Sequence, residues 1–133
     1  MGAVKRCILV VDDHAAVRHA LALVLAEEGI GDCWEAGERR EALEIAGQQP
    51  PDLALVDLSL DGALDLIEEL SGRKIPVLVC SMREEPECVR RAMAAGARGY
   101  ITKFEAPQKL ARAVLDLLAG WILISPRATK GFR

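Results

Sequence analysis

Positive charge is scarce in this chain of 133 residues. Lys and Arg number 17 against 20 Asp and Glu, and the formal net charge is -3. No basic run is dense enough to follow a phosphate backbone. We therefore expect that this stretch does not bind DNA by itself.

Cysteine is also sparse, and the four that occur lack the spacing of metal ligands: Cys7, Cys33, Cys80 and Cys88. Two of them, Cys7 and Cys80, lie in apolar runs that are typical of buried strands. Buried free thiols in a reducing cytoplasm fit this pattern better than disulfides do.

Long hydrophobic runs are missing as well. The apolar stretch near the N-terminus ends at Asp12 and Asp13, which is too early for the core of a signal peptide. The most apolar later segment, residues 113–124, contains Asp116 and falls short of the ~20 residues needed to cross a bilayer. A cytoplasmic protein without a membrane span is the expectation.

What the chain does contain is an alternation of short apolar runs with longer stretches of helical periodicity, which predicts βαβ units. Val17, Leu21 and Leu25, for example, fall on one helical face and are expected in the core. We predict one α/β domain over residues 1–125, a doubly wound parallel sheet, with the start of a linker or tail over residues 126–133. Five strands are predicted: Cys7–Val11, Cys33–Ala36, Leu53–Val56, Ile75–Cys80 and Gly99–Thr102.

Polar residues collect where these predicted strands end. Asp12 and Asp13 follow the first strand, Asp57 the third, Ser81 the fourth and Lys103 the fifth. Any one of them alone is more typical of a turn or a helix cap. Ligands of doubly wound sheets bind beyond the carboxyl ends of the strands, so the joint placement points to one functional site.

The residue types at this rim suit phosphoryl chemistry. Carboxylates brought together repel one another, and a hard cation such as Mg²⁺, which prefers oxygen ligands, relieves that repulsion. Lys103 supplies a compact positive charge for phosphoryl oxygens, and Ser81 supplies a hydroxyl. Asp57 is the predicted nucleophile, because a carboxylate can form an aspartyl-phosphate.

Several segments carry a resemblance to a known family: Ile8-Leu-Val-Val-Asp-Asp-His14, Leu55-Val-Asp-Leu58, Cys80-Ser81 and Gly99-Tyr-Ile-Thr-Lys103. From about Lys5 to Ser125 the chain resembles the response-regulator receiver family. Ala95-Gly-Ala-Arg-Gly-Tyr100 and the ending Leu123-Ile-Ser-Pro126 are similar to its NarL/FixJ-type branch, whose members carry a LuxR-type helix-turn-helix domain after the receiver.

The resemblance implies a flavodoxin-like (βα)5 fold with strand order 2-1-3-4-5. It implies that Asp13, Asp57 and the backbone carbonyl of Ser59 bind Mg²⁺, with Asp12 acting largely through water. Ser81 and Lys103 would hold the phosphoryl group.

Tyr100 stands where the family has an aromatic that turns inward as the Ser81 hydroxyl moves toward the phosphate. A half-buried strand aromatic is the alternative interpretation of Tyr100.

The implied partner is a sensor histidine kinase that phosphorylates Asp57. A homodimer is a further candidate assembly, and DNA would be reached only through a C-terminal helix-turn-helix domain outside this chain. Such a module is a regulatory phosphoacceptor rather than an enzyme, with at most self-catalysed phosphoryl transfer and hydrolysis.

One segment departs from the family pattern. After Asp57 the chain reads Leu-Ser-Leu-Asp-Gly, so that Asp61 replaces the usual proline and the loop is about two residues shorter. Asp61 either adds negative charge near the site and weakens it, or points into solvent while Gly62 restores the turn.

Three alternatives follow: a pseudo-receiver that acts by constitutive dimerisation, a stand-alone receiver, and a flavodoxin-like cofactor-binding domain. The first strand turn lacks a Gly-rich phosphate loop, which argues against the last of these.

Overall fold

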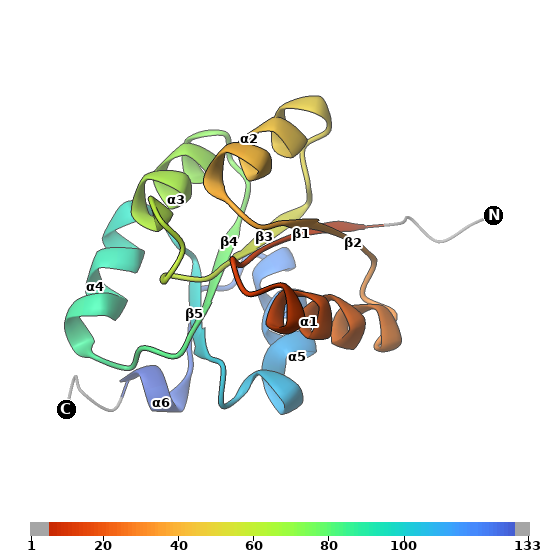
Figure 1. Ribbon diagram of the computed structural model, residues 1–133. Helices are drawn as coiled ribbons and strands as arrows, with labels where there is room; N and C mark the ends of the chain where they lie inside the picture. The colour runs from red at the N-terminus through yellow and green to blue at the C-terminus, as the bar shows by residue number, and fades with distance from the viewer. Residues whose placement is uncertain (1–5, 130–133) are drawn as a thin grey trace.

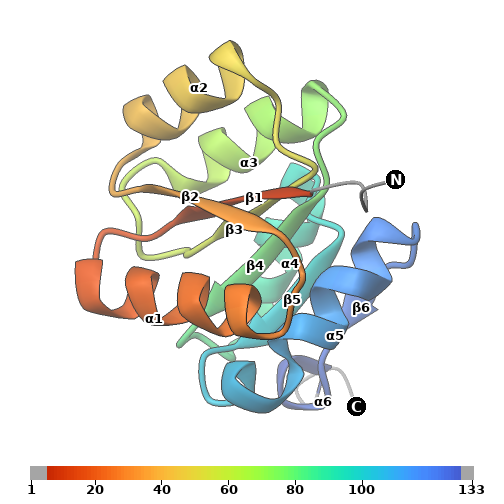
Figure 2. The same ribbon diagram turned by 90° about the vertical axis from the view of Figure 1, so that its right-hand side faces the viewer.

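A computed structural model describes residues 6–129 of the chain as one parallel sheet covered by helices on both faces (Figures 1 and 2). Neighbouring strands are paired in the order β2-β1-β3-β4-β5-β6. The strands are β1 (Cys7–Val11), β2 (Asp32–Ala36), β3 (Leu53–Val56), β4 (Val77–Ser81), β5 (Gly99–Thr102) and β6 (Leu123–Ile124). The helices are α1 (Ala15–Glu27), α2 (Arg39–Gln48), α3 (Ala63–Gly72), α4 (Pro86–Ala95), α5 (Ala106–Leu118) and α6 (Pro126–Thr129).

The alternation of side chains along β1 explains the layers. Leu9 and Val11 point into a cluster with apolar residues of α2, α3 and α4, while Ile8 and Val10 point into a second cluster with residues of α1 and α5. Because both faces of the sheet are covered, the central strands are apolar on successive residues. The α/β doubly wound prediction is thereby confirmed, including the order of the first five strands.

The prediction of five strands was wrong, because the described part of the chain forms six. The additional strand β6 is only two residues long and pairs in parallel with β5. In the sequence it lies at the end of an apolar stretch that continues from α5. Gly120, with a φ of 96°, ends that helical stretch in a left-handed conformation and lets the chain turn back toward the sheet.

The structure bears on two further expectations. The start of a linker or tail was predicted over residues 126–133; residues 126–129 form the short helix α6, whose Ala128 is fully buried, and residues 130–133 lie outside the described residues. Val17, expected in the core, is 37% exposed, whereas Leu21 and Leu25 of the same helix are buried.

The described cysteines are all free thiols, and Cys80 is buried while Cys7 is only partly so. Among residues 6–129, no helix combines the length and the apolar character needed to cross a membrane.

Candidate functional site

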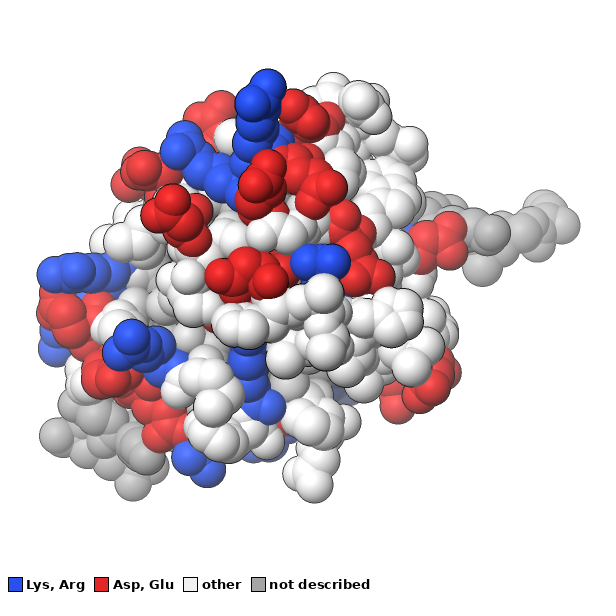
Figure 3. Space-filling view, in the orientation of Figure 1, with Lys and Arg blue, Asp and Glu red and all other residues white. Residues whose placement is uncertain are grey.

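The sheet brings the predicted polar residues together at the carboxyl ends of its strands. Asp12 directly follows β1, Asp57 directly follows β3, Ser81 ends β4 and Lys103 directly follows β5. Backbone hydrogen bonds fix these ends in register: the amide of Asp57 donates to the carbonyl of Val11 at 3.0 Å, and that of Lys103 to the carbonyl of Ser81 at 2.9 Å. Acidic side chains gather in the middle of the face that this rim presents (Figure 3).

A buried charge cluster forms the floor of the site. Asp12 is 1% exposed and Asp57 is 3% exposed. The Lys103 ammonium lies 2.8 Å from Oδ2 of Asp12 and 3.1 Å from Oδ2 of Asp57. Burial acts to lower the pKa of Lys103, but its hydrogen bonds to the two carboxylates outweigh burial, and the pKa is raised. Lys103 therefore carries a firm positive charge directly beside Asp57.

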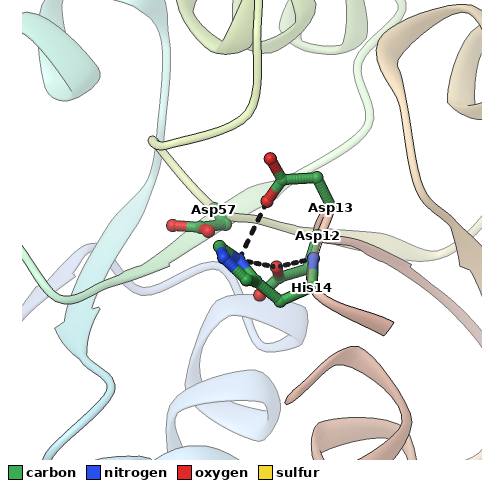
Figure 4. A group of neighbouring side chains, drawn as sticks. All are labelled: Asp12, Asp13, His14 and Asp57. Carbon is green, nitrogen blue, oxygen red and sulfur yellow. Dashed lines mark hydrogen bonds and ion pairs between the residues drawn. The ribbon is translucent and has the colours of Figure 1, made fainter. Parts of the chain in front are cut away.

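Two exposed groups complete this acidic end of the rim. Oxygen or nitrogen atoms of Asp12, Asp13, His14 and Asp57 all lie within 4.8 Å of one another. Figure 4 shows the Asp13 and His14 side chains approaching Asp57 from the segment that follows β1. With three carboxylates against one ammonium, the cluster holds surplus negative charge, and its oxygen atoms suit a hard divalent cation.

His14 was not among the predicted ligands. Its backbone amide donates to Oδ1 of Asp12 at 2.9 Å, and its Nδ1 lies 3.0 Å from Oδ1 of Asp13. Its place directly after the two aspartates is the sequence signal that could have included it.

The short loop after Asp57 wraps around the carboxylate. Ser59 donates its backbone amide to Oδ1 of Asp57 at 3.3 Å and its hydroxyl to Oδ2 at 2.5 Å. Ser59 was expected to act through its backbone carbonyl, and this role of its hydroxyl was not predicted. Asp61 is exposed, and Gly62 takes a φ of 73° before α3 begins. Of the two interpretations of Asp61, the one in which its side chain faces solvent therefore describes this loop. Asp57 still lies directly after β3 despite the altered loop sequence.

Comparison with known proteins decides the family. Residues 8–115 match the family described as "Response regulator receiver domain". The chain belongs to this family.

Curated relatives of the receiver include proteins named as regulators. This chain is 34% identical over 125 residues to the response regulator GacA of Pseudomonas aeruginosa. The matched region covers 90% of this chain and 58% of GacA. This chain is also 37% identical over 105 residues to the transcriptional regulatory protein PdtaR of Mycobacterium tuberculosis. That match covers 76% of this chain and 51% of PdtaR. The receiver thus spans little more than half the length of these relatives.

Solved structures agree with the fold. A LuxR-family two-component response regulator from Aurantimonas sp. SI85-9A1 has a TM-score of 0.89 at 26% identity, covering 96% of this chain and 95% of that one. The signal receiver domain of NarL from Mycobacterium tuberculosis has a TM-score of 0.79 at 28% identity, and the match covers 89% of this chain and 99% of that one. The resemblance to NarL-type and LuxR-type regulators is confirmed.

Ser81 and Tyr100 of the receiver meet in the loop after β4. Ser81 is 1% exposed, and its hydroxyl oxygen accepts a hydrogen bond from the amide of Arg83 at 3.1 Å. Tyr100 is fully buried and donates its phenolic hydroxyl to the carbonyl of Arg83 at 2.7 Å. Burial raises the pKa of Tyr100 to about 12, so the phenol remains a donor. Both side chains thus bond to the same residue of one loop.

Arg18 supports the receiver site from below and was not predicted. Its Nη1 donates to the backbone carbonyl of Asp12 at 2.9 Å, and its Nε to Oε1 of Glu35 on β2 at 3.0 Å. The guanidinium thereby ties α1, the end of β1 and β2 together. No local motif marks this role, because Glu35 lies 17 residues from Arg18 on another strand.

Proposed function

We propose that this receiver accepts a phosphoryl group on Asp57 from a sensor histidine kinase. A carboxylate oxygen of Asp57 forms a bond to phosphorus while the bond from phosphorus to the kinase histidine nitrogen breaks, and that nitrogen then takes up a proton. The observation that carries the proposal is the position of the Lys103 ammonium, 3.1 Å from the Asp57 carboxylate at a buried strand end. Such a cation stabilises charge on the transferred phosphoryl oxygens.

The surrounding groups have separate roles. Asp12, Asp13, Asp57 and the Ser59 carbonyl would hold Mg²⁺, which fits the surplus negative charge of these carboxylates. When bound, Mg²⁺ neutralises charge shared between Asp57 and the phosphoryl oxygens. Ser81 donates its hydroxyl to a phosphoryl oxygen, and Lys103 binds another. The residues act in a regulatory transfer, with self-catalysed hydrolysis as the return step.

The output that we propose is control of transcription in the cytoplasm. PdtaR is named a transcriptional regulatory protein and GacA a response regulator; both are longer than this chain, which matches less than two thirds of each. A DNA-binding domain C-terminal to the receiver would read the phosphorylation state through an altered contact or through a homodimer.

Incubation of the protein with Mg²⁺ and acetyl phosphate, followed by intact-mass measurement, tests the proposal. We expect the mass gain of one phosphoryl group in the wild type and none in Asp57→Asn. Asp65→Asn is the matched control, because Asp65 is 68% exposed on α3 and should leave the adduct intact. An adduct that persists in Asp57→Asn, or fails to form in the wild type, would overturn the proposal.

The pseudo-receiver alternative depends on Asp61 disturbing the metal site. Asp61 is exposed and lies outside the acidic group found among the described residues, which weakens that alternative. Mg²⁺ titration separates the two: binding that is lost in Asp13→Asn supports the phosphoacceptor, whereas absence of binding in the wild type supports the pseudo-receiver.

A further inference from the structure

The segment Ser125–Thr129, here called the C-terminal segment, lies against the two loops that follow β4 and β5. Figure 1 shows α6 beneath the stretch that leads from β4 into α4, and beside the loop that follows β5. Within the segment Ser125 is 2% exposed and Ala128 is fully buried. The amide of Ser125 donates to the carbonyl of Tyr100 at 2.9 Å and so extends the pairing between β6 and β5.

Glu105 fastens the start of the C-terminal segment. This carboxylate is only 8% exposed, and its Oε1 accepts hydrogen bonds from the Ser125 hydroxyl at 2.6 Å and from the Thr102 hydroxyl at 2.9 Å. Its Oε2 accepts the backbone amide of Arg127 at 3.5 Å. Glu105 is two residues beyond Lys103, so the segment is fastened to the loop that bears the phosphoryl-binding lysine.

Arg127 fastens the segment to the other loop. Its Nε donates to Oε2 of Glu84 at 2.7 Å, and its guanidinium lies 4.8 Å from the centre of the Phe104 ring. Glu84 follows Arg83, the residue that bonds both the Ser81 hydroxyl and the Tyr100 phenol. Phe104 directly follows Lys103. Arg127 thus bridges the loop after Ser81 and the loop after Lys103.

We propose that the C-terminal segment is a latch that senses the state of Asp57, and that phosphorylation weakens it; this inference rests on the proposed function. Ser81 and Lys103 are the two groups that would bind phosphoryl oxygens, and each is within three residues of a latch contact. In the structure the Lys103 ammonium is paired with Asp57 itself. A phosphoryl group placed between them shifts Lys103 and draws Ser81 toward Asp57, which displaces Phe104 and Glu84 from Arg127.

The contact made by Arg127 is of a strength that such a shift can break. Arg127 is 48% exposed and Glu84 is 18% exposed, so water competes for the ion pair. The bonds to Glu105 lie deeper and hold the start of the segment in place. We therefore expect loosening at Arg127, Ala128 and Thr129, with less change at Ser125.

Amide hydrogen exchange of the full chain tests the latch. Beryllofluoride with Mg²⁺ serves as the phosphoryl mimic, and fluorine NMR of the same sample reports its occupancy. We expect exchange at residues 127–129 to become about fivefold faster when the mimic is bound, the low end of typical coupling between sites. Arg127→Gln should show the faster exchange without the mimic.

Arg112→Gln is the matched control, because Arg112 is 81% exposed on α5 and pairs with Asp116 of the same helix. By reciprocity, Arg127→Gln should bind the mimic about fivefold more tightly than the wild type, and Arg112→Gln should not.

The outcomes distinguish the two proposals. Bound mimic with unchanged exchange at residues 127–129 overturns the latch and leaves the proposed function standing. Absence of bound mimic in the wild type overturns the proposed function, and the latch as a phosphorylation sensor with it.

Discussion

Two buried acidic groups lie at the carboxyl ends of the strands of this receiver, Asp57 after β3 and Glu105 in the loop after β5, and their surroundings differ. Asp57 shares the Lys103 ammonium with Asp12, and Asp13 adds a third carboxylate nearby. Asp57 also accepts hydrogen bonds from the amide and hydroxyl of Ser59. Glu105 accepts hydrogen bonds from Ser125, from the Thr102 hydroxyl and from backbone amides, and the Lys109 ammonium lies 3.6 Å from its Oε2. Around Asp57 three carboxylates face one ammonium, so negative charge is in excess. The oxygen atoms of Glu105, in contrast, are occupied by hydrogen-bond donors.

This difference separates reactivity from structural support. Burying carboxylates that share one cation costs stability, and such a cost is retained where a further cation or a phosphoryl group is to be bound. A buried carboxylate surrounded by donors stabilises the groups that it joins. Asp57 and Glu105 should therefore respond in opposite directions when their charge is removed.

The largest effect is expected at Glu105. The substitution Glu105→Gln removes the carboxylate charge. It also places an amide NH₂, a hydrogen-bond donor, beside the Ser125 and Thr102 hydroxyls and the Arg127 amide, which are donors to Glu105. We expect the free energy of unfolding to fall by about 2 kcal/mol, the scale of a hydrogen bond to a buried charge. Urea denaturation measures this change.

Glu44→Gln is the control for Glu105→Gln. Glu44 is 62% exposed and pairs with Arg40 on the same helix, so its loss should cost less than about 0.5 kcal/mol. Equal effects of the two substitutions would contradict the structural role of Glu105.

The contrast between the two groups also shows how far sequence reasoning reaches. Asp57 and Lys103 were predicted because parallel strands bring their ends to one rim, so position along the chain determines position in space. Glu105 was missed because its partner Ser125 lies 20 residues away and follows β6, a strand too short to give a periodic signal. Hydrogen bonds between side chains of separate loops depend on packing that periodicity does not encode.

A smaller effect of opposite sign is expected at Asp57. In Asp57→Asn, without Mg²⁺, one buried carboxylate becomes neutral while Lys103 keeps Asp12 as its partner. We expect the free energy of unfolding to rise by about 1 kcal/mol, because the desolvation cost of one charge is removed. Urea denaturation of Asp57→Asn beside the exposed-site variant Asp65→Asn measures it. A loss of stability larger than that of Asp65→Asn would mean that the Asp57 charge is structural.

The dependence of stability on pH gives the smallest and most specific difference. Burial acts to raise the pKa of Glu105, but hydrogen bonds from Ser125 and Thr102 outweigh burial, and the pKa is lowered. A lowered folded-state pKa contributes stability above the ordinary carboxyl value of about 4.3, and that contribution is lost as pH falls through the folded-state value. Glu35, whose pKa is also lowered, contributes equally to the wild type and to Glu105→Gln.

The difference in the free energy of unfolding between the wild type and Glu105→Gln should therefore stay constant from pH 8 to about 5 and narrow below about 4. Urea denaturation across this pH range measures the difference. If it did not change with pH, the charge of the Glu105 carboxylate would not contribute to stability.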